Sequence, residues 1–330
     1  MNETNKNTIL NLPIFQKNRE KGRIVALGYF DGVHRGHQEI LRAAMKEAHT
    51  REMLSAVHSF TTPPVSKKNE NIKIPFLLTV EDEKMILFEK QNIDEVFLTP
   101  FEKSVEQLSP EEFLNIYMVQ LFGARAIVTG EDYRFGKDRE GDVSFLHKWG
   151  AKNQIEICTV PALQQEEKTI ASAWIRELLR NGEIETANDL LGYPVSFSGE
   201  IEKGYQIGRT IQFPTANMRI SPEKIIPRHG VYASIFKTDN QFYPSISNIG
   251  IRPTMNRDEK AVCLETMLFD QNLDLYGKQA SVFLLHFIRE EMHFNSIDTL
   301  SMQMKKDALQ TREYHNAYRS AYSVFFPTML

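Results

Sequence analysis

The chain has 330 residues, of which 42% are hydrophobic and 25% charged, and these proportions are ordinary for a globular protein. Its length exceeds what a single hydrophobic core usually supports, so we expect two domains. The 39 basic and 43 acidic side chains are interspersed and give a net charge of -4, which argues against a general nucleic-acid binder or a protein held on anionic membranes.

The N-terminal segment is polar, unlike the basic and then apolar start of a signal peptide. No apolar run reaches the roughly 20 residues that cross a bilayer. Cys158 and Cys263 stand in unrelated contexts, without the spacing of a disulfide framework or a thiolate zinc site. We therefore expect a cytoplasmic protein with two free thiols, and the sequence leaves open whether its copies form a homo-oligomer.

Short apolar runs alternate with helical patterns in the first half of the chain. The expected strands are residues 24–27, 54–60, 94–98, 126–129 and 155–160. The expected helices are residues 36–53, 80–91 and 109–122. This alternation predicts a doubly wound α/β domain with a parallel sheet, whose ligands bind at the carboxyl ends of the strands.

A glycine-rich turn joins the first expected strand to the first expected helix. It reads Gly28-Tyr-Phe-Asp-Gly-Val-His-Arg-Gly-His-Gln38 and brings His34 and His37 to the start of the helix. The free N–H groups and the positive dipole end of a helix favour an anion there, and two ring N–H donors beside Arg35 would hold a phosphate chain. The turn therefore predicts a phosphate site, the alternative being two surface or capping histidines.

Towards residue 192 the pattern changes, after two short expected helices at residues 172–180 and 183–191. The expected strands beyond it are residues 195–201, 231–236, 242–249, 262–269 and 281–288. Short runs broken by turns in this way predict an antiparallel barrel or sandwich. A terminal helix over residues 296–317 should pack on it, with residues 311–315 on a solvated face. Its expected apolar stripe consists of Leu300, Met304, Ala308 and Leu309.

The N-terminal half resembles the FAD synthetase domain of the prokaryotic bifunctional riboflavin kinase/FMN adenylyltransferases. The turn matches the family signature G-x-F-D-G-V-H-x-G-H-Q, and further blocks are Pro75-Phe-Leu-Leu-Thr79, Leu108-Ser-Pro-Glu-Glu-Phe113 and Gly130-Glu-Asp-Tyr-Arg-Phe-Gly136. The resemblance implies a Rossmann-like nucleotidyltransferase domain that transfers an adenylyl group from ATP to FMN. It implies that His34 and His37 are catalytic and that Phe60 and Asp132 bind the flavin. The ATP-binding residues that it implies are Gly28, Phe30, Asp31, Gly36, Ser172 and Arg176.

The C-terminal half resembles the riboflavin kinase domain of the same proteins. The blocks are Lys203-Gly-Tyr-Gln-Ile-Gly-Arg-Thr210, Phe213-Pro-Thr-Ala-Asn217, Gly230-Val-Tyr-Ala233, Ser247-Asn-Ile-Gly-Ile-Arg-Pro-Thr254, Leu264-Glu265 and Asp274-Leu-Tyr-Gly277. The resemblance implies a mainly antiparallel β-barrel with a C-terminal helix, which phosphorylates riboflavin with ATP and Mg²⁺. Thr215 and Asn217 would hold magnesium-ATP, and Glu265 would orient or deprotonate the riboflavin 5′-hydroxyl. The other implied contacts are Gly204, Gly208 and Arg209 to ATP, and Arg252 to the flavin.

The resemblance divides the chain into an N-terminal extension over residues 1–20, an FMN adenylyltransferase domain over residues 21–192 and a riboflavin kinase domain over residues 193–330. The small-molecule substrates and products would be riboflavin, FMN, FAD and ATP. No nucleic-acid or membrane partner is expected.

The chain departs from the family at three places. Ser59-Phe-Thr-Thr-Pro-Pro64, with Thr61 and Thr62, lacks the acid and the histidine of the family's Phe-Asp-Pro-His-Pro stretch. Ala171 and Ala173 replace two hydroxyl residues of a Ser-Ser-Thr-x-Ile-Arg block, and Gln206 and Gln212 replace glycines of the phosphate loop. Two alternatives follow from these departures: a monofunctional paralogue with one decayed domain, or a regulator that binds flavin without turning it over.

Overall fold

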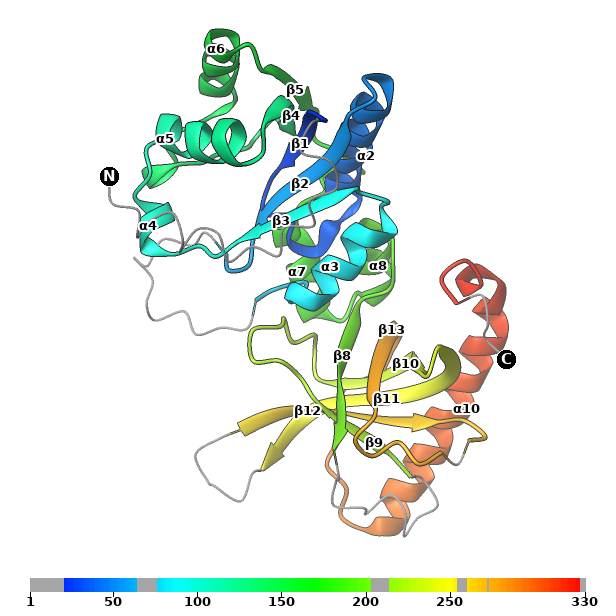
Figure 1. Cartoon of the computed structure of the whole chain (residues 1–330). Coiled ribbons are helices and arrows are strands. Elements are labelled where there is room, and N and C mark those ends of the chain that lie inside the picture. The colour runs from blue at the N-terminus through cyan, green and yellow to red at the C-terminus, as the bar shows by residue number, and fades with distance from the viewer. Residues whose placement is uncertain (1–20, 64–75, 203–213, 254–259, 272, 327–330) are drawn as a thin grey trace. The chain divides into compact units, whose positions relative to one another are not determined.

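The computed structural model describes residues 21–63, 76–202, 214–253, 260–271 and 273–326 (Figure 1). Its contacts divide the chain into two compact units. The first comprises Met1–Ile74 and Thr79–Ser172, and the second comprises Pro75–Leu78 and Ala173–Leu330. Within the described ranges, no helix combines the length and the apolar character that a membrane crossing requires.

The first unit is built on a five-stranded parallel sheet with the strand order β3-β2-β1-β4-β5 (Figure 1). The strands are β1 (Arg23–Leu27), β2 (Leu54–Phe60), β3 (Glu95–Thr99), β4 (Ala124–Gly130) and β5 (Glu156–Val160). The order reverses between β1 and β4, and such a switch point is where open α/β sheets bind their ligands. The predicted doubly wound domain is confirmed, and the histidine turn follows the carboxyl end of β1.

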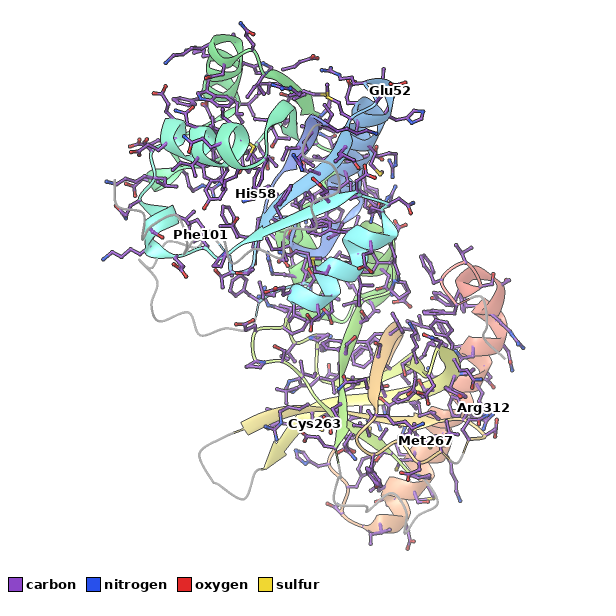
Figure 2. All side chains as sticks on the ribbon, viewed as in Figure 1. Glu52, His58, Phe101, Cys263, Met267 and Arg312 are labelled. Carbon is purple, nitrogen blue, oxygen red and sulfur yellow. The ribbon has the colours of Figure 1, made fainter. Side chains whose placement is uncertain are left out.

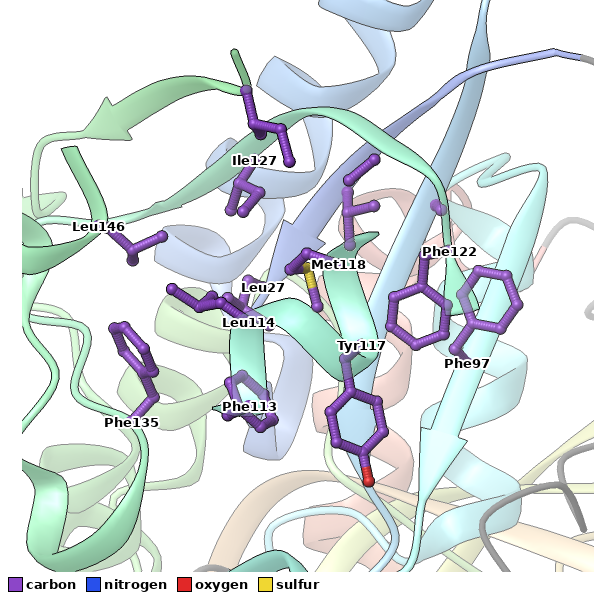
Figure 3. Packing of buried hydrophobic residues seen from close by; sticks show 14 of the residues in the cluster. Leu27, Phe97, Phe113, Leu114, Tyr117, Met118, Phe122, Ile127, Phe135 and Leu146 are labelled. Atoms are coloured by element: carbon purple, nitrogen blue, oxygen red, sulfur yellow. The ribbon is translucent and has the colours of Figure 1, made fainter. Parts of the chain in front are cut away.

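Strand β1 is buried on both faces of this sheet. Ile24 and Ala26 pack in one hydrophobic cluster with residues of α2 (Arg35–Thr50) and α3 (Glu81–Lys90). Val25 and Leu27 point to the opposite face, where they join the cluster drawn in Figure 3. Successive strand residues alternate between faces, so a strand covered on both sides reads as a continuous apolar run.

The remaining elements of the first unit surround the sheet. They are η1 (Asp31–Val33), α4 (Lys103–Glu106), α5 (Pro110–Leu114), η3 (Asn115–Leu121), η4 (Lys137–Arg139), α6 (Val143–Asn153), and the hairpin β6 (Gln164–Gln165) and β7 (Lys168–Thr169). The start of α5 is as predicted, since the Ser109 hydroxyl accepts from the Glu112 N–H and the Glu112 carboxylate accepts from the Ser109 N–H. The single helix expected over residues 109–122 passes instead into a π-helix, η3.

The second unit contains a closed antiparallel barrel with the order β10-β11-β12-β9-β8-β13 (Figure 1). The strands are β8 (Ser196–Glu202), β9 (Ala216–Arg219), β10 (Gly230–Thr238), β11 (Gln241–Pro253), β12 (Lys260–Leu268) and β13 (Gln279–Arg289). Strand β8 pairs with both β9 and β13, and this pairing makes the unit a barrel rather than a sandwich.

Three helices complete the second unit: α7 (Ser172–Asn181), α8 (Ile184–Leu191) and α10 (Ile297–Tyr322). The expected faces of α10 are partly wrong, because Thr311 and His315 are buried while Leu309 is 60% exposed. A polar partner explains the burial of His315, whose Nε2 lies 3.1 Å from the main-chain oxygen of Ser245. Helical periodicity identified the helix, but the barrel wall decided which face it buries.

Candidate active sites

The histidine turn of the first unit brings two imidazole rings into contact. His34 caps α2 and accepts a hydrogen bond at Nδ1 from the His37 N–H, over 3.4 Å. The two rings are stacked, with centroids 3.6 Å apart and planes inclined by 19°. A Cβ at Gly36 would lie 3.3 Å from the His34 ring, so glycine gives this ring the room to stack. Because His34 Nδ1 accepts this hydrogen bond, Nε2 is the ring nitrogen of His34 that can donate to a ligand.

The electrostatics of this turn favour a bound anion. Burial, with the nearby His34 and Lys84, holds the pKa of His37 well below its usual range, so its imidazole is neutral at neutral pH. Its Nδ1 is buried and has no hydrogen-bond partner among the residues that the structure describes. The first turn of α2 carries no acidic residue that would offset the positive end of the helix dipole. A phosphate oxygen at this helix start would supply the missing partner.

Hydrogen bonds to neighbouring segments fasten the turn. The Asp31 carboxylate accepts from the Thr79 N–H over 3.2 Å, and the Thr79 hydroxyl accepts from the Gly32 N–H over 3.0 Å. The Ser172 hydroxyl donates to the main-chain oxygen of Asp31 over 2.9 Å. Asp31 and Ser172, both expected to contact ATP, thus hold the shape of the turn.

A cavity of about 510 Å³ lies next to this turn in the first unit. Asp132 borders it, and so do the cationic side chains of Arg134, Lys137 and Arg139. Its aromatic walls are the rings of Tyr29, Phe60, Phe101 (labelled in Figure 2), Phe113, Tyr133 and Phe135. Flat rings of this kind suit a planar aromatic ligand, and the cations suit an anionic group on it.

Phe60 and Asp132, the two residues predicted to bind the flavin, both border this cavity, together with rings that the sequence analysis had not assigned to a site. Tyr133 and Phe135 stand two residues apart in the Gly130–Gly136 block, so their spacing after a predicted strand was an available signal. Burial raises the pKa of the Tyr133 hydroxyl, which therefore stays neutral. Phe101 reaches the cavity from the connection between β3 and α4, and Phe113 reaches it from α5, so neither could have been assigned from a local pattern.

A second cavity, of about 340 Å³, lies within the second unit. Thr215 and Glu265 both border it, together with Met267 of β12, which is labelled in Figure 2. Asn217 of β9 is in register with Glu265 of β12, and its Nδ2 donates to the main-chain oxygen of Thr215 over 3.4 Å. Three residues expected to act together are therefore brought to the same part of the barrel.

An ion pair between the barrel and the terminal helix borders the same cavity. Arg289 of β13 donates from Nε to both carboxylate oxygens of Asp307, each over 3.0 Å, and from Nη2 over 2.6 Å. Gln303 donates to the same carboxylate over 2.7 Å. Asp307 is almost fully buried, so this bidentate pair fixes α10 against the cavity. Sequence analysis missed it because the partners lie 18 residues apart on different elements.

The other predicted ATP and flavin residues lie as follows. The Gly28 N–H donates to the main-chain oxygen of His58 over 3.3 Å. Arg176 belongs to the second unit, where its Nε donates to the main-chain oxygen of Phe76 over 2.6 Å. Arg252 lies on β11 in register with Ala261. Gly204, Gly208 and Arg209 lie outside the described residues, as do Gln206 and Gln212.

The resembled FAD synthetase pattern is altered at four described residues: Thr61, Thr62, Ala171 and Ala173. The Thr61 N–H donates to the main-chain oxygen of Thr99 over 3.1 Å, and the Thr62 hydroxyl accepts from the Phe101 N–H over 3.3 Å. Ala171 is half-buried, while Ala173 is exposed. A slightly larger side chain at either position would therefore not crowd a packed core.

Metal-ligating side chains do not cluster in the part of the chain that the structure describes: no group of three or more His, Cys, Asp or Glu residues is placed to hold an ion. Thr215 and Asn217 offer a different donor set, a hydroxyl and an amide oxygen. Hard oxygen donors that leave room for several waters suit Mg²⁺.

Comparisons with known proteins match both halves of the chain. Residues 16–174 match the family model described as FAD synthetase, and residues 191–315 match the one described as riboflavin kinase. The bifunctional riboflavin kinase/FMN adenylyltransferase of Listeria monocytogenes is 35% identical over 88% of this chain and 92% of its own length. The Escherichia coli protein of the same name is 32% identical, over 92% and 96%.

A solved structure also covers most of the chain. It is described as a macrolide-efflux protein from Streptococcus pneumoniae and is 31% identical to this chain. Its TM-score is 0.79, and the match covers 89% of this chain and 95% of that one. The two-unit architecture is therefore shared with an experimentally determined fold.

Proposed function

The chain belongs to the family of bifunctional riboflavin kinases/FMN adenylyltransferases, and on this premise we propose how its residues divide the two reactions. The enzyme phosphorylates riboflavin to FMN with ATP and then adenylylates FMN to FAD. One observation carries the assignment of sites: each unit has its own cavity, bordered by the residue types that its reaction needs.

Adenylyl transfer takes place at the histidine turn of the first unit. An oxygen of the FMN phosphate attacks the α-phosphorus of ATP, a new P–O bond forms, and the bond to the bridging oxygen breaks to release pyrophosphate. His34 and His37 donate ring N–H groups to the phosphate oxygens on which charge builds. The isoalloxazine ring of FMN occupies the aromatic cavity. The cationic side chains of Arg134, Lys137 and Arg139 face the anionic phosphate group of FMN.

Phosphoryl transfer takes place at the cavity of the second unit. Glu265 orients the riboflavin 5′-hydroxyl and accepts its proton as the oxygen attacks the γ-phosphorus of ATP. The bond between the γ-phosphorus and its bridging oxygen breaks, and ADP leaves. The flavin occupies the cavity between Glu265 and the Arg289–Asp307 pair.

Mg²⁺ enters with ATP as part of the substrate. The Thr215 hydroxyl and the Asn217 amide oxygen would hold it beside Glu265, and hard oxygen donors of this kind fit the ion. When bound, the ion neutralises charge on the ATP phosphates. The chain's own residues position the hydroxyl and take its proton.

We place the adenylyltransferase domain at residues 21–192, after an N-terminal extension, and the kinase domain at residues 193–330. The family matches, which leave residues 175–190 between them, support this division. The helices α7 and α8 lie mainly in the second compact unit, so the functional and the packing boundaries differ. We also place the enzyme in the cytoplasm.

The experiment that tests this function supplies riboflavin and FMN separately, each with ATP and Mg²⁺, and separates the flavins by chromatography. Riboflavin should yield FMN and then FAD, and FMN alone should yield FAD. A single product would favour a paralogue with one decayed domain. Absence of both products would favour a flavin-binding regulator.

Restoring the hydroxyl groups of the altered phosphate block should raise adenylyl transfer. A hydrogen bond to a charged group contributes about 1.5–3 kcal/mol, and each 1.4 kcal/mol is about tenfold in rate. The double substitution Ala171→Ser with Ala173→Thr should therefore increase the rate of FAD formation at least about tenfold. Riboflavin phosphorylation, measured in the same samples, should not change. If FAD formation does not rise, the missing hydroxyls do not limit the reaction.

A further inference from the structure

Lys84 is a buried cation in the first unit that the reaction described above does not use. It lies on α3 and is only 2% exposed. Its Nζ donates to the main-chain oxygen of Tyr29 over 3.1 Å and to that of Phe60 over 3.3 Å. Lysine is almost never fully buried without a reason, because removing an ammonium group from water costs several kcal/mol.

The two acceptors of Lys84 belong to residues that line the aromatic cavity. Tyr29 follows β1 and Phe60 ends β2, and the rings of both border the cavity. The ammonium group also lies over the Tyr29 ring, 4.1 Å from its centroid. The Ser59 hydroxyl donates to the same Tyr29 oxygen over 2.6 Å. Lys84 thus holds two of the residues that line the cavity, Tyr29 and Phe60.

The segment that Lys84 fastens also supports the histidine pair. Phe30, next to Tyr29, has left-handed backbone angles of φ 54° and ψ 38°, a conformation that a bulky residue adopts only when its surroundings impose it. Its ring meets His37 edge-on, with centroids 5.3 Å apart, and meets Phe88 of α3 at 5.9 Å. Of these two adjacent residues, Tyr29 therefore lines the cavity and Phe30 packs against His37.

We propose that Lys84 is a positioning residue of the adenylyl-transfer reaction, which couples the aromatic cavity to the histidine pair by holding the carboxyl ends of β1 and β2 together. The proposal rests on the proposed function of this site. Misplacing reacting groups by about 1 Å can cost about 100-fold in rate, so losing this clamp should act mainly on kcat.

The charge of Lys84 makes this role testable by its dependence on pH. Burial lowers the pKa of its ammonium group to about 8, although the carboxylates of Asp31 and Glu81 oppose that shift. The ammonium is therefore present below pH 8 and lost above it. The other groups facing it are the His37 imidazole on α2, which is already neutral in this range, and the Tyr29 ring. The clamp should weaken as the pH rises through about 8.

The test compares Lys84→Met and Lys84→Arg with Lys90→Met, a control on an exposed residue of the same helix. Lys84→Met should lower kcat for FAD formation about 10- to 100-fold and change the KM for FMN less than about threefold. Lys84→Arg should recover most of the loss and should remove the decline of wild-type kcat above about pH 8. Lys90→Met should behave as wild type.

Two further measurements separate positioning from folding and from the proposed function. Riboflavin phosphorylation in each variant should stay within about twofold of wild type, and FMN binding should persist in Lys84→Met. The role of Lys84 would be refuted if Lys84→Met lost both FMN binding and the thermal unfolding transition of the adenylyltransferase domain. It would also be refuted if the kcat of Lys84→Met were unchanged. Wild-type protein that forms no FAD, or an active His37→Ala variant, would contradict the proposed site itself.

Discussion

Replacing Glu265 by glutamine should lower riboflavin phosphorylation about 100- to 10,000-fold while FAD formation from added FMN continues at its wild-type rate. Glutamine keeps the volume of the side chain but cannot accept the proton of the attacking hydroxyl. Glu265 borders the cavity of the second unit and is in register with Asn217, so the substitution acts where hydroxyl and phosphate must meet.

The matched control is Glu200→Gln, because Glu200 is an exposed carboxylate on strand β8 of the same barrel. Its kinase activity should equal that of wild type, and both variants should share one thermal unfolding curve. Initial rates of FMN formation measured at saturating ATP separate the outcomes. A Glu265→Gln enzyme that keeps more than about a third of wild-type kcat would show that another group takes the proton.

Replacing His37 by alanine should lower adenylyl transfer about 100- to 10,000-fold and leave riboflavin phosphorylation unchanged. The substitution removes a ring N–H donor from the start of α2 and one half of the stacked pair with His34. FAD formation from FMN and ATP measures the effect. The control is His49→Ala, an exposed histidine in the last turn of the same helix.

The pH profile supplies a second check on His37. Its pKa lies well below the usual range, so the free enzyme already holds the neutral imidazole at neutral pH. As the pH rises from about 6 to 7.5, kcat/KM for FAD formation should not fall on account of this group. A decline centred near pH 6.5 that disappears in His37→Ala would show that the protonated ring is required instead.

The structure confirms the predicted sheet because its signals are local. Strand β1 is buried on both faces, and its residues 24–27 therefore read as an uninterrupted apolar run. The glycine-rich turn after it is equally clear from the sequence. Gly36 shows why the turn has its composition, since a Cβ there would crowd the His34 ring. The strand and the turn are each specified by residues adjacent in the sequence, so no tertiary information was needed to find them.

The cavity walls and Lys84 could not be predicted in the same way. Lys84 follows three acidic residues at the start of an ordinary helix, and nothing in that pattern distinguishes it from a solvated lysine. Its partners, the main-chain oxygens of Tyr29 and Phe60, lie 55 and 24 residues away. Every residue has a main-chain oxygen, so the residue types in the sequence do not show which ones accept from Lys84. Only the folded structure shows that this cation is buried.

The sequence by itself determined the family, the parallel sheet of the first domain, the helix that begins after His34 and carries His37, and the strand on which Glu265 lies. Each depends on periodicity or spacing within a few residues. The tertiary structure alone decided that β8 closes a barrel, that α10 buries Asp307 and His315 rather than Leu309, and which rings surround the first cavity. Those outcomes depend on contacts between segments distant in the chain, where the partner determines whether burying a polar or aromatic side chain is favourable.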